Sequence, residues 1–187
     1  PDKFGKLRQL WQRLLNEEQC RSLLDVGCSA GLAGFLALDA GIEQVRCIDH
    51  DSEYVAAVQQ LAGNRLVASV VPFGHPLGAP VDIVHCGALI HWVYSLTANY
   101  RNFGKILRYL LGYVRPGKFL CLEWVDPQDG AVQAFKHNRN LSPGDQAYTL
   151  ENFEKAVRDH GTLRQRFAVD GPHRVMYVIQ QRNPSTA

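Results

Sequence analysis

Two acidic residues, Asp25 and Asp49, each end an apolar run, and a turn of small residues follows the first of them. The first run reads LLDVGCSAG over residues 23–31, and Asp49 comes eighteen residues after Gly31. This spacing is typical of a strand–helix–strand unit that builds a pocket for an adenosine-bearing cofactor. Glycine suits the turn because a Cβ would collide with a ligand lying against bare backbone. The second carboxylate can accept hydrogen bonds from both ribose hydroxyls.

The glycine pattern separates one kind of cofactor from another. Glycines stand at Gly27, Gly31 and Gly34, but Ser29 occupies the place of the second glycine in the dinucleotide fingerprint. That glycine lets a pyrophosphate come close, so its absence disfavours NAD and FAD. Asp25 would repel a phosphate and suits the sulfonium and ammonium of S-adenosylmethionine. The alternatives are packing glycines at an ordinary strand–helix corner and a solvated carboxylate at the end of the second strand.

On these residues the chain resembles the class I S-adenosylmethionine-dependent methyltransferases. Residues 25–31 (DVGCSAG) resemble their first motif, 47–51 (CIDHD) the second and 81–88 (VDIVHCGA) the fourth. Residues 110–122 look like the helix, turn and strand that follow. The resemblance covers roughly residues 22–125. It implies a Rossmann-like fold, S-adenosylmethionine as the cofactor, and transfer of its methyl group.

The resemblance and the spacing together define the expected cofactor site. Residues 70–74 (VVPFG) follow the third expected strand and lack the acid that the family often has near the adenine, which leaves the adenine contacts undefined. The residues expected to bind the cofactor are Asp25, Gly27, Cys28, Ser29, Gly31, Asp49, His50, Phe73, Cys86 and Gly87.

The residues after the fourth and fifth strands are expected to face the methyl acceptor, because ligands of open α/β sheets bind at the carboxyl ends of the strands. Methyl transfer is an in-line displacement, and a neighbouring base that takes the acceptor's proton is worth about 10²–10⁴-fold in rate. His91 is the first choice for that base, since it closely follows the fourth strand, with Glu123 second and His137 third. The alternatives are a helix-capping or core-edge role for His91 and a loop-orienting role for Glu123.

Other side chains near these strands are expected to have structural roles. His85 lies inside the fourth strand and reads as a core histidine with a hydrogen-bond partner. Trp92 and Trp124 could stack on a ring substrate, but packing is the favoured reading. Residues 127–148 form a connection longer than the usual ~2–6 residues, and we interpret it as a lid that excludes water.

Length and composition agree with one globular domain over residues 1–187, which carries a net charge of +2 and gives no strong field toward nucleic acid or membrane. The five cysteines are scattered and form no C-x-x-C pair, so we expect no metal site and no disulfide framework, and a cytoplasmic location. No apolar run approaches the ~20 residues of a membrane span, and no signal peptide is evident. Pro1 in place of methionine indicates a trimmed chain or a piece of a larger polypeptide, and residues 182–187 read as a disordered tail.

Strand-like and helix-like segments alternate along the chain, which predicts an α/β fold with a single Rossmann-like, doubly wound sheet. We expect a mostly parallel sheet with helices on both faces, and the resemblance implies an antiparallel last strand. An amphipathic helix within residues 1–16 precedes it. The expected strands are 22–27, 44–49, 66–71, 82–86, 118–125, 163–169 and 174–181. The expected helices are 32–40, 52–62, 100–114 and 150–159.

Three functions remain open at this level. The first is methyl transfer to an oxygen or nitrogen of a small-molecule or sugar-like acceptor. The second is an RNA 2′-O or cap methyltransferase, which residues 171–177 faintly resemble. That family uses a Lys-Asp-Lys-Glu tetrad, and this chain lacks the aspartate of the tetrad on the fourth strand. The stripe of basic residues expected of an RNA-binding surface is also weak. The third is a catalytically silent, cofactor-binding partner subunit.

Overall fold

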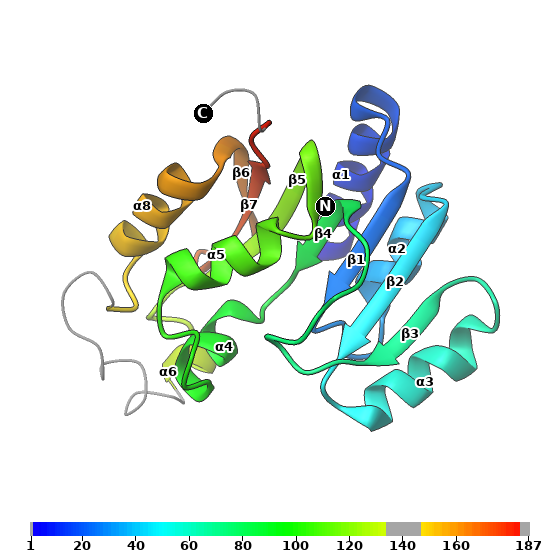
Figure 1. Cartoon of the computed structure of the whole chain (residues 1–187), viewed down its shortest axis with the longest axis horizontal. Coiled ribbons are helices and arrows are strands. Elements are labelled where there is room, and N and C mark those ends of the chain that lie inside the picture. Colours follow the sequence, from blue (N-terminus) through cyan, green and yellow to red (C-terminus); the bar gives the residue numbers. More distant parts are fainter. Residues whose placement is uncertain (1, 134–146, 184–187) are drawn as a thin grey trace.

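A seven-stranded sheet organises the computed structural model, which describes residues 2–133 and 147–183 (Figure 1). The strands lie in the order β3-β2-β1-β4-β5-β7-β6. Neighbouring strands from β3 to β5 are parallel, whereas β7 runs antiparallel to both β5 and β6. The strands are β1 (Ser22–Val26), β2 (Gln44–Asp49), β3 (Val67–Val70), β4 (Val81–Cys86), β5 (Val114–Val125), β6 (Thr162–Asp170) and β7 (Arg174–Gln180).

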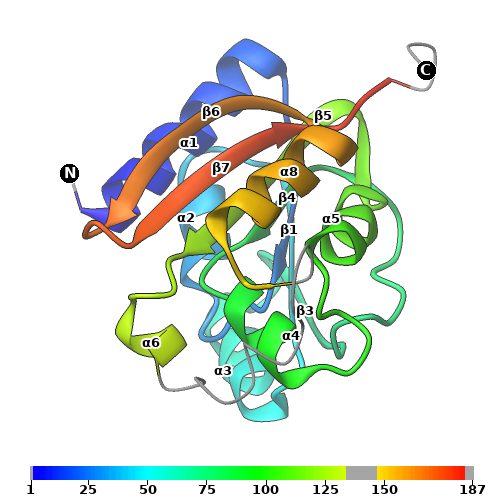
Figure 2. The ribbon, with the colours of Figure 1, turned by 90° about the vertical axis from the view of Figure 1, so that its left-hand side faces the viewer.

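Helices cover both faces of the sheet, and each face has its own apolar core. Helices α1, α2 and α3 pack on one face, and α4, α5 and α8 pack on the other (Figures 1 and 2). Successive residues of β1 serve opposite cores: Leu23 faces the α1 side and Leu24 the α5 side. The helices are α1 (Lys3–Glu18), α2 (Leu32–Asp39), α3 (Ser52–Ala62), α4 (Ile90–Leu96), α5 (Phe103–Leu111), α6 (Gly130–Gln133) and α8 (Leu150–His160).

Helix α1 forms because a cap and an apolar stripe coincide. The Asp2 side chain accepts a hydrogen bond from the amide of Gly5, which satisfies one of the free donors of the first turn. The stripe predicted from the sequence is buried against the sheet at Leu7, Leu10, Trp11 and Leu14. The helix ends at Gln19, whose φ of 54° is left-handed. The left-handed turn at Gln19 redirects the chain from α1 into β1, which begins at Ser22.

The predicted fold class is confirmed: the sheet is doubly wound, mostly parallel, and closed by an antiparallel strand. The β6–β7 hairpin forms one edge of the sheet, with α8 beside it (Figure 2). Three elements differ from the prediction. Helix α4 lies where no element was predicted, α5 begins at Phe103 rather than at residue 100, and β5 begins at Val114, which pairs with Val81, rather than at residue 118.

Helix α5 starts late because Asn102 caps it by accepting a hydrogen bond from the amide of Lys105. Most of the predicted lid falls at residues 134–146, outside the described ranges, although α6 lies at its start. Within the ranges that the structure covers, no helix is both long and apolar enough to cross a bilayer.

Candidate functional site

The turn after β1 is held against the end of β2 by backbone hydrogen bonds. The amides of Gly27 and Cys28 both donate to the carbonyl of Ile48, at 2.9 and 3.0 Å. Gly27 has a φ of 71°, and Ser29 has a φ of 48°, which is unusual for a residue with a side chain. Left-handed conformations of this kind cluster where a protein binds its ligands.

Asp49 lies at the carboxyl end of β2 and is almost buried, with 6% of its surface exposed. Its Oδ2 accepts a hydrogen bond from the Ser29 amide at 2.8 Å, and its Oδ1 accepts one from the Asp51 amide at 3.1 Å. The exposed imidazole of His50 also reaches Oδ1, at 3.0 Å. These contacts fix the carboxylate beside the turn. A carboxylate oxygen has two acceptor sites, so each oxygen keeps capacity for a ligand hydroxyl once His50 swings away.

A cavity of about 710 Å³ opens at the carboxyl ends of β1, β2 and β4. This volume lies within the ~300–1,000 Å³ typical of small-molecule sites. The predicted cofactor residues that line it are Gly27, Ser29, Asp49, His50, Phe73 and Gly87. The predicted residues that do not line it are Asp25, Cys28, Gly31 and Cys86.

The turn glycines make room for side chains as much as for a ligand. A Cβ on Gly31 would lie 2.8 Å from Cγ2 of Val58, and one on Gly34 would lie 2.6 Å from Sγ of Cys47. At Gly27 the nearest atoms belong to Leu89, at 2.7 Å. At Gly31 and Gly34, protein side chains therefore occupy the space beside the backbone.

Asp25 points away from the cavity, toward α1. Its Oδ1 lies 2.7 Å from Nδ1 of His85, and both side chains are almost fully buried. The indole of Trp11 packs edge-on against the His85 ring, with 5.4 Å between centroids. The structure thus gives Asp25 a partner within the protein, and Asp25 does not line the cavity. The reading of His85 as a core histidine with a partner agrees with this geometry.

His91, the first choice for a base, lies in α4 with 1% of its surface exposed and does not line the cavity. Among the described residues, neither ring nitrogen has a hydrogen-bond partner. Burial, helped by the charge of Arg174, lowers the pKa of His91 to about 4, while Asp129 opposes that shift. The imidazole is therefore neutral at pH 7, and contact with a substrate would require the wall in front of it to move.

Glu123, the second choice, is completely buried on β5. Its Oε2 accepts a hydrogen bond from Nζ of Lys3 in α1 at 2.7 Å, and Oε1 lies 3.9 Å from Nη1 of Arg174. Arg174 in turn makes a two-pronged ion pair with Asp129, at 2.9 and 3.1 Å. These contacts tie α1, β5 and β7 together. The third choice, His137, lies outside the described residues.

Sequence reasoning missed the wall that α4 contributes. Leu89, Trp92, Val93 and Leu96 all line the cavity, together with Tyr54 from α3. A helix of seven residues with no side-chain cap leaves little signal in the sequence. The spacing of residues 89, 92, 93 and 96 is helical, and it is the one pattern that could have revealed this face.

Comparison with known proteins points to one fold. No protein-family model matches the chain, and neither does any curated protein sequence. Solved structures do match. The N-methyltransferase NodS from Bradyrhizobium japonicum WM9, in complex with S-adenosyl-L-homocysteine, aligns over 97% of this chain and 89% of its own, with a TM-score of 0.69 and 12% identity.

A second similar structure is magnesium protoporphyrin IX methyltransferase (ChlM) from Synechocystis PCC 6803 with bound SAM, at a TM-score of 0.68 and 15% identity over 95% of this chain and 79% of that one. A TehB-like SAM-dependent methyltransferase from Corynebacterium glutamicum aligns with a TM-score of 0.64 and 15% identity, over 92% of this chain and 87% of its own. The chain has the class I methyltransferase fold.

The class I methyltransferase fold explains where the cavity lies. Strands β1 and β4 are neighbours, yet the chain winds outward from them in opposite directions, so their carboxyl ends form a topological switch point. Gly27 follows β1 and Gly87 follows β4, and both line the cavity. The cavity therefore occupies the crevice in which open α/β sheets bind their ligands.

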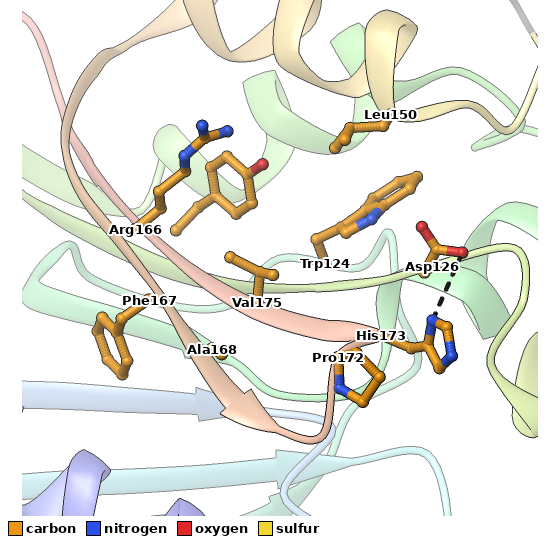
Figure 3. A pocket seen from close by; sticks show the side chains of 10 residues that line it. Trp124, Asp126, Leu150, Arg166, Phe167, Ala168, Pro172, His173 and Val175 are labelled. Atoms are coloured by element: carbon orange, nitrogen blue, oxygen red, sulfur yellow. Dashed lines mark ion pairs between the residues drawn. The ribbon is translucent and has the colours of Figure 1, made fainter.

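A smaller cavity of about 350 Å³ lies between the β6–β7 hairpin, the end of β5 and the start of α8 (Figure 3). Its polar groups are engaged with protein partners. Nη1 of Arg166 and the hydroxyl of Tyr177 both reach Oε1 of Glu154, at 2.6 and 2.8 Å. Asp126 and His173 face each other across 3.9 Å at the other end (Figure 3). The larger cavity is the better candidate site, because it lies at the switch point.

Proposed function

We propose that the protein binds S-adenosylmethionine in the 710 Å³ cavity and transfers its methyl group to an oxygen or nitrogen of a small acceptor. The observation that carries this proposal is the position of Asp49: a nearly buried carboxylate at the end of β2, facing the switch point of β1 and β4. A carboxylate there suits the two hydroxyls of a ribose. The related fold of methyltransferases solved with SAM or SAH supports the same ligand.

The residues present fit the rest of such a ligand. Val71, Pro72 and Phe73 follow β3 and give the cavity an apolar side for an adenine ring. Phe73 is held by ring contacts with Tyr100 and Tyr109, at 4.9 and 4.6 Å between centroids. Gly27 and Ser29 offer backbone on the other side. When bound, S-adenosylmethionine supplies an electrophilic methyl group on a positively charged sulfur.

This chain would contribute mainly by positioning, which can account for much of the rate of a reaction between two bound partners. His91 and Glu123 stay predictions for a general base. Both are buried and neither lines the cavity, so contact with a bound acceptor would require a rearrangement of the surrounding side chains. The polar cluster of Lys3, Glu123 and Arg174 links α1 to β5 and β7.

Calorimetry with S-adenosylhomocysteine tests the proposal. We expect binding that NAD does not compete with, and Asp49→Ala should weaken it by about 1–3 kcal/mol. Asp51→Ala is the matched control, since this neighbouring carboxylate caps α3 by accepting from the Glu53 amide and does not line the cavity. Unchanged affinity in the Asp49 variant would remove the ribose assignment. Binding without methyl transfer to any acceptor class would favour the silent-subunit alternative.

A further inference from the structure

Helix α4 presents two large apolar side chains to the cavity. Trp92 and Leu96 lie one turn apart on the same side of the helix, and they are 44% and 53% exposed. Large apolar side chains grouped at the wall of a cavity mark a place where a ligand covers apolar surface. The Trp92 ring contacts that of His91, with 5.7 Å between centroids, but it is far more exposed than Trp11 and Trp124, which are at most 2% exposed.

The α4 wall adjoins the turn that follows β1. The side chain of Leu89 contacts Gly27, at the turn that follows β1. Trp92 follows one turn later, and its amide donates to the carbonyl of Leu89 at 3.0 Å. Ala88, the residue before Leu89, has a φ of 47° and also lines the cavity. A ring lying on Trp92 would therefore be close to whatever group is held above Gly27.

The charge of the cavity is confined to its other end. Among the described residues that line it, Asp49, His50 and Tyr54 are the titratable ones, and no lysine or arginine is present. The hydroxyl of Thr97 donates to the Val93 carbonyl at 2.7 Å and accepts from the Tyr100 amide, so it is already used. A phosphate or carboxylate on the acceptor would meet no counter-charge on this part of the wall.

We infer that the acceptor is an uncharged, flat aromatic molecule that stacks on Trp92 and carries a phenolic hydroxyl as the methylated group. This inference rests on the proposed function and specifies its substrate class. Stacking on an indole suits a planar ring, and the neighbouring Leu89 and Leu96 extend the apolar contact. A sugar would cover this surface with hydroxyl groups that the described wall does not satisfy.

A phenol also suits this wall because His91, the histidine next to Trp92, is buried and does not line the cavity. A phenolic hydroxyl has an ordinary pKa of about 10, so it loses its proton to water far more readily than an aliphatic alcohol does. The oxygen lone pair forms the new C–O bond while the S–CH₃ bond breaks, and that bonding pair stays on sulfur as a neutral thioether. The proton leaves to solvent, and no further reactant is needed.

Binding to the product complex tests this inference without relying on turnover. The protein is saturated with S-adenosylhomocysteine and titrated by calorimetry with 7-hydroxycoumarin, a flat neutral phenol, and separately with methyl glucoside and a short RNA. We expect 7-hydroxycoumarin alone to bind. Trp92→Ala should weaken that binding at least about tenfold, and Trp92→Phe should recover most of it. Incubation with tritiated S-adenosylmethionine should label 7-hydroxycoumarin.

Phe4→Ala is the matched control, because Phe4 is a 43% exposed aromatic outside the cavity, and it should leave coumarin affinity unchanged. Each outcome has one reading. If the wild type does not bind S-adenosylhomocysteine, the proposed function itself fails. If S-adenosylhomocysteine binds but neutral phenols do not, or Trp92→Ala binds them as well as the wild type does, the acceptor class is wrong and the cofactor site stands. Binding or labelling of RNA or the sugar in place of the phenol would likewise overturn it.

Discussion

Nδ1 of His85 lies 2.7 Å from Oδ1 of Asp25, and these two residues stand side by side on β4 and β1 in the register of the sheet. The pair is sealed from solvent between the sheet and Trp11 of α1. A residue from the most diagnostic motif of the sequence is thus part of the core beneath the cavity and not part of its wall.

Breaking this pair should affect stability far more than cofactor affinity. Asp25→Ala leaves a buried ring nitrogen of His85 without its partner, and an unsatisfied buried polar group typically costs about 1–3 kcal/mol. We expect a large drop in the urea midpoint, with S-adenosylhomocysteine affinity changed less than about threefold in the folded fraction. Asp25→Asn keeps the shape of the side chain, so its urea midpoint should lie between those of the wild type and Asp25→Ala. Normal stability together with a large loss of affinity would mean that Asp25 contacts the ligand directly.

The stability of the protein should depend on pH through His91. Its pKa in the folded protein is about 4, against an ordinary value of 6.5, because burial disfavours the charged ring. The unfolded chain therefore binds the proton more readily, and stability present above pH 6.5 is lost as the pH falls toward 4. The full effect is up to about 3 kcal/mol.

Urea unfolding of the wild type and His91→Leu between pH 7 and pH 4.5 measures this effect. The leucine variant should lose less stability across that window, so the gap between the two proteins should widen in its favour on acidification. Replacing the exposed His75 with glutamine serves as the control and should leave the slope as it is. Parallel curves for wild type and His91→Leu would show that the buried ring does not resist protonation.

The fold could be predicted from the sequence because its signals are local and repeated. Apolar runs that end in Asp25 and Asp49, with glycines between them, specify a strand–helix–strand unit, and strands and helices go on alternating along most of the chain. Helix α4 could not be found in this way. It has seven residues, and Leu89 at its start supplies no side-chain cap, so tertiary packing rather than local sequence decides it.

The site was predictable only in part, for a reason that lies in strand pairing. Gly27, Ser29 and Asp49 follow or end their strands, so their position needs only the βαβ pattern. The direction of the Asp25 side chain depends on its neighbour His85, sixty residues away, which only the strand order reveals. Glu123 likewise meets Lys3 across 120 residues, a contact without a local signal.

The ion pair between Lys3 and Glu123 should anchor α1 to the sheet. Glu123 is fully buried and the Lys3 side chain is 20% exposed, so Lys3→Met should destabilise the protein by about 2 kcal/mol, somewhat less than a fully buried pair would. Chemical denaturation of Lys3→Met, Glu123→Leu and the double variant measures the coupling. The double variant should recover stability relative to the sum of the single changes, because no charge is then left alone.

Lys6→Met is the comparison for that series. Lys6 lies on the same helix, and its ammonium donates to the carbonyl of Ala168 at 2.7 Å without a carboxylate partner. Its loss should cost no more than about 1 kcal/mol. Equal effects at both lysines would indicate that the buried carboxylate gains nothing specific from Lys3.

Two glycine-to-alanine changes separate packing from backbone freedom. A Cβ at Gly34 would lie 2.6 Å from Sγ of Cys47 and 3.3 Å from Cγ1 of Val45, so Gly34→Ala must push α2 away from β2. Overpacking of this kind typically costs about 1–3 kcal/mol. At Gly130, in the first turn of α6, a Cβ would meet nothing within 4 Å, so Gly130→Ala should be neutral or stabilise by up to about 1 kcal/mol.

Thermal and urea unfolding of both variants distinguishes the two effects, and titration with S-adenosylhomocysteine adds a functional readout. Because α2 carries the turn that faces the cavity at its start, a displaced helix in Gly34→Ala should also weaken binding of S-adenosylhomocysteine, whereas Gly130→Ala should bind it normally. If Gly34→Ala proves as stable as the wild type, the third glycine of the motif is not required by contact with β2. Its presence would then need an explanation in the ligand rather than in the packing.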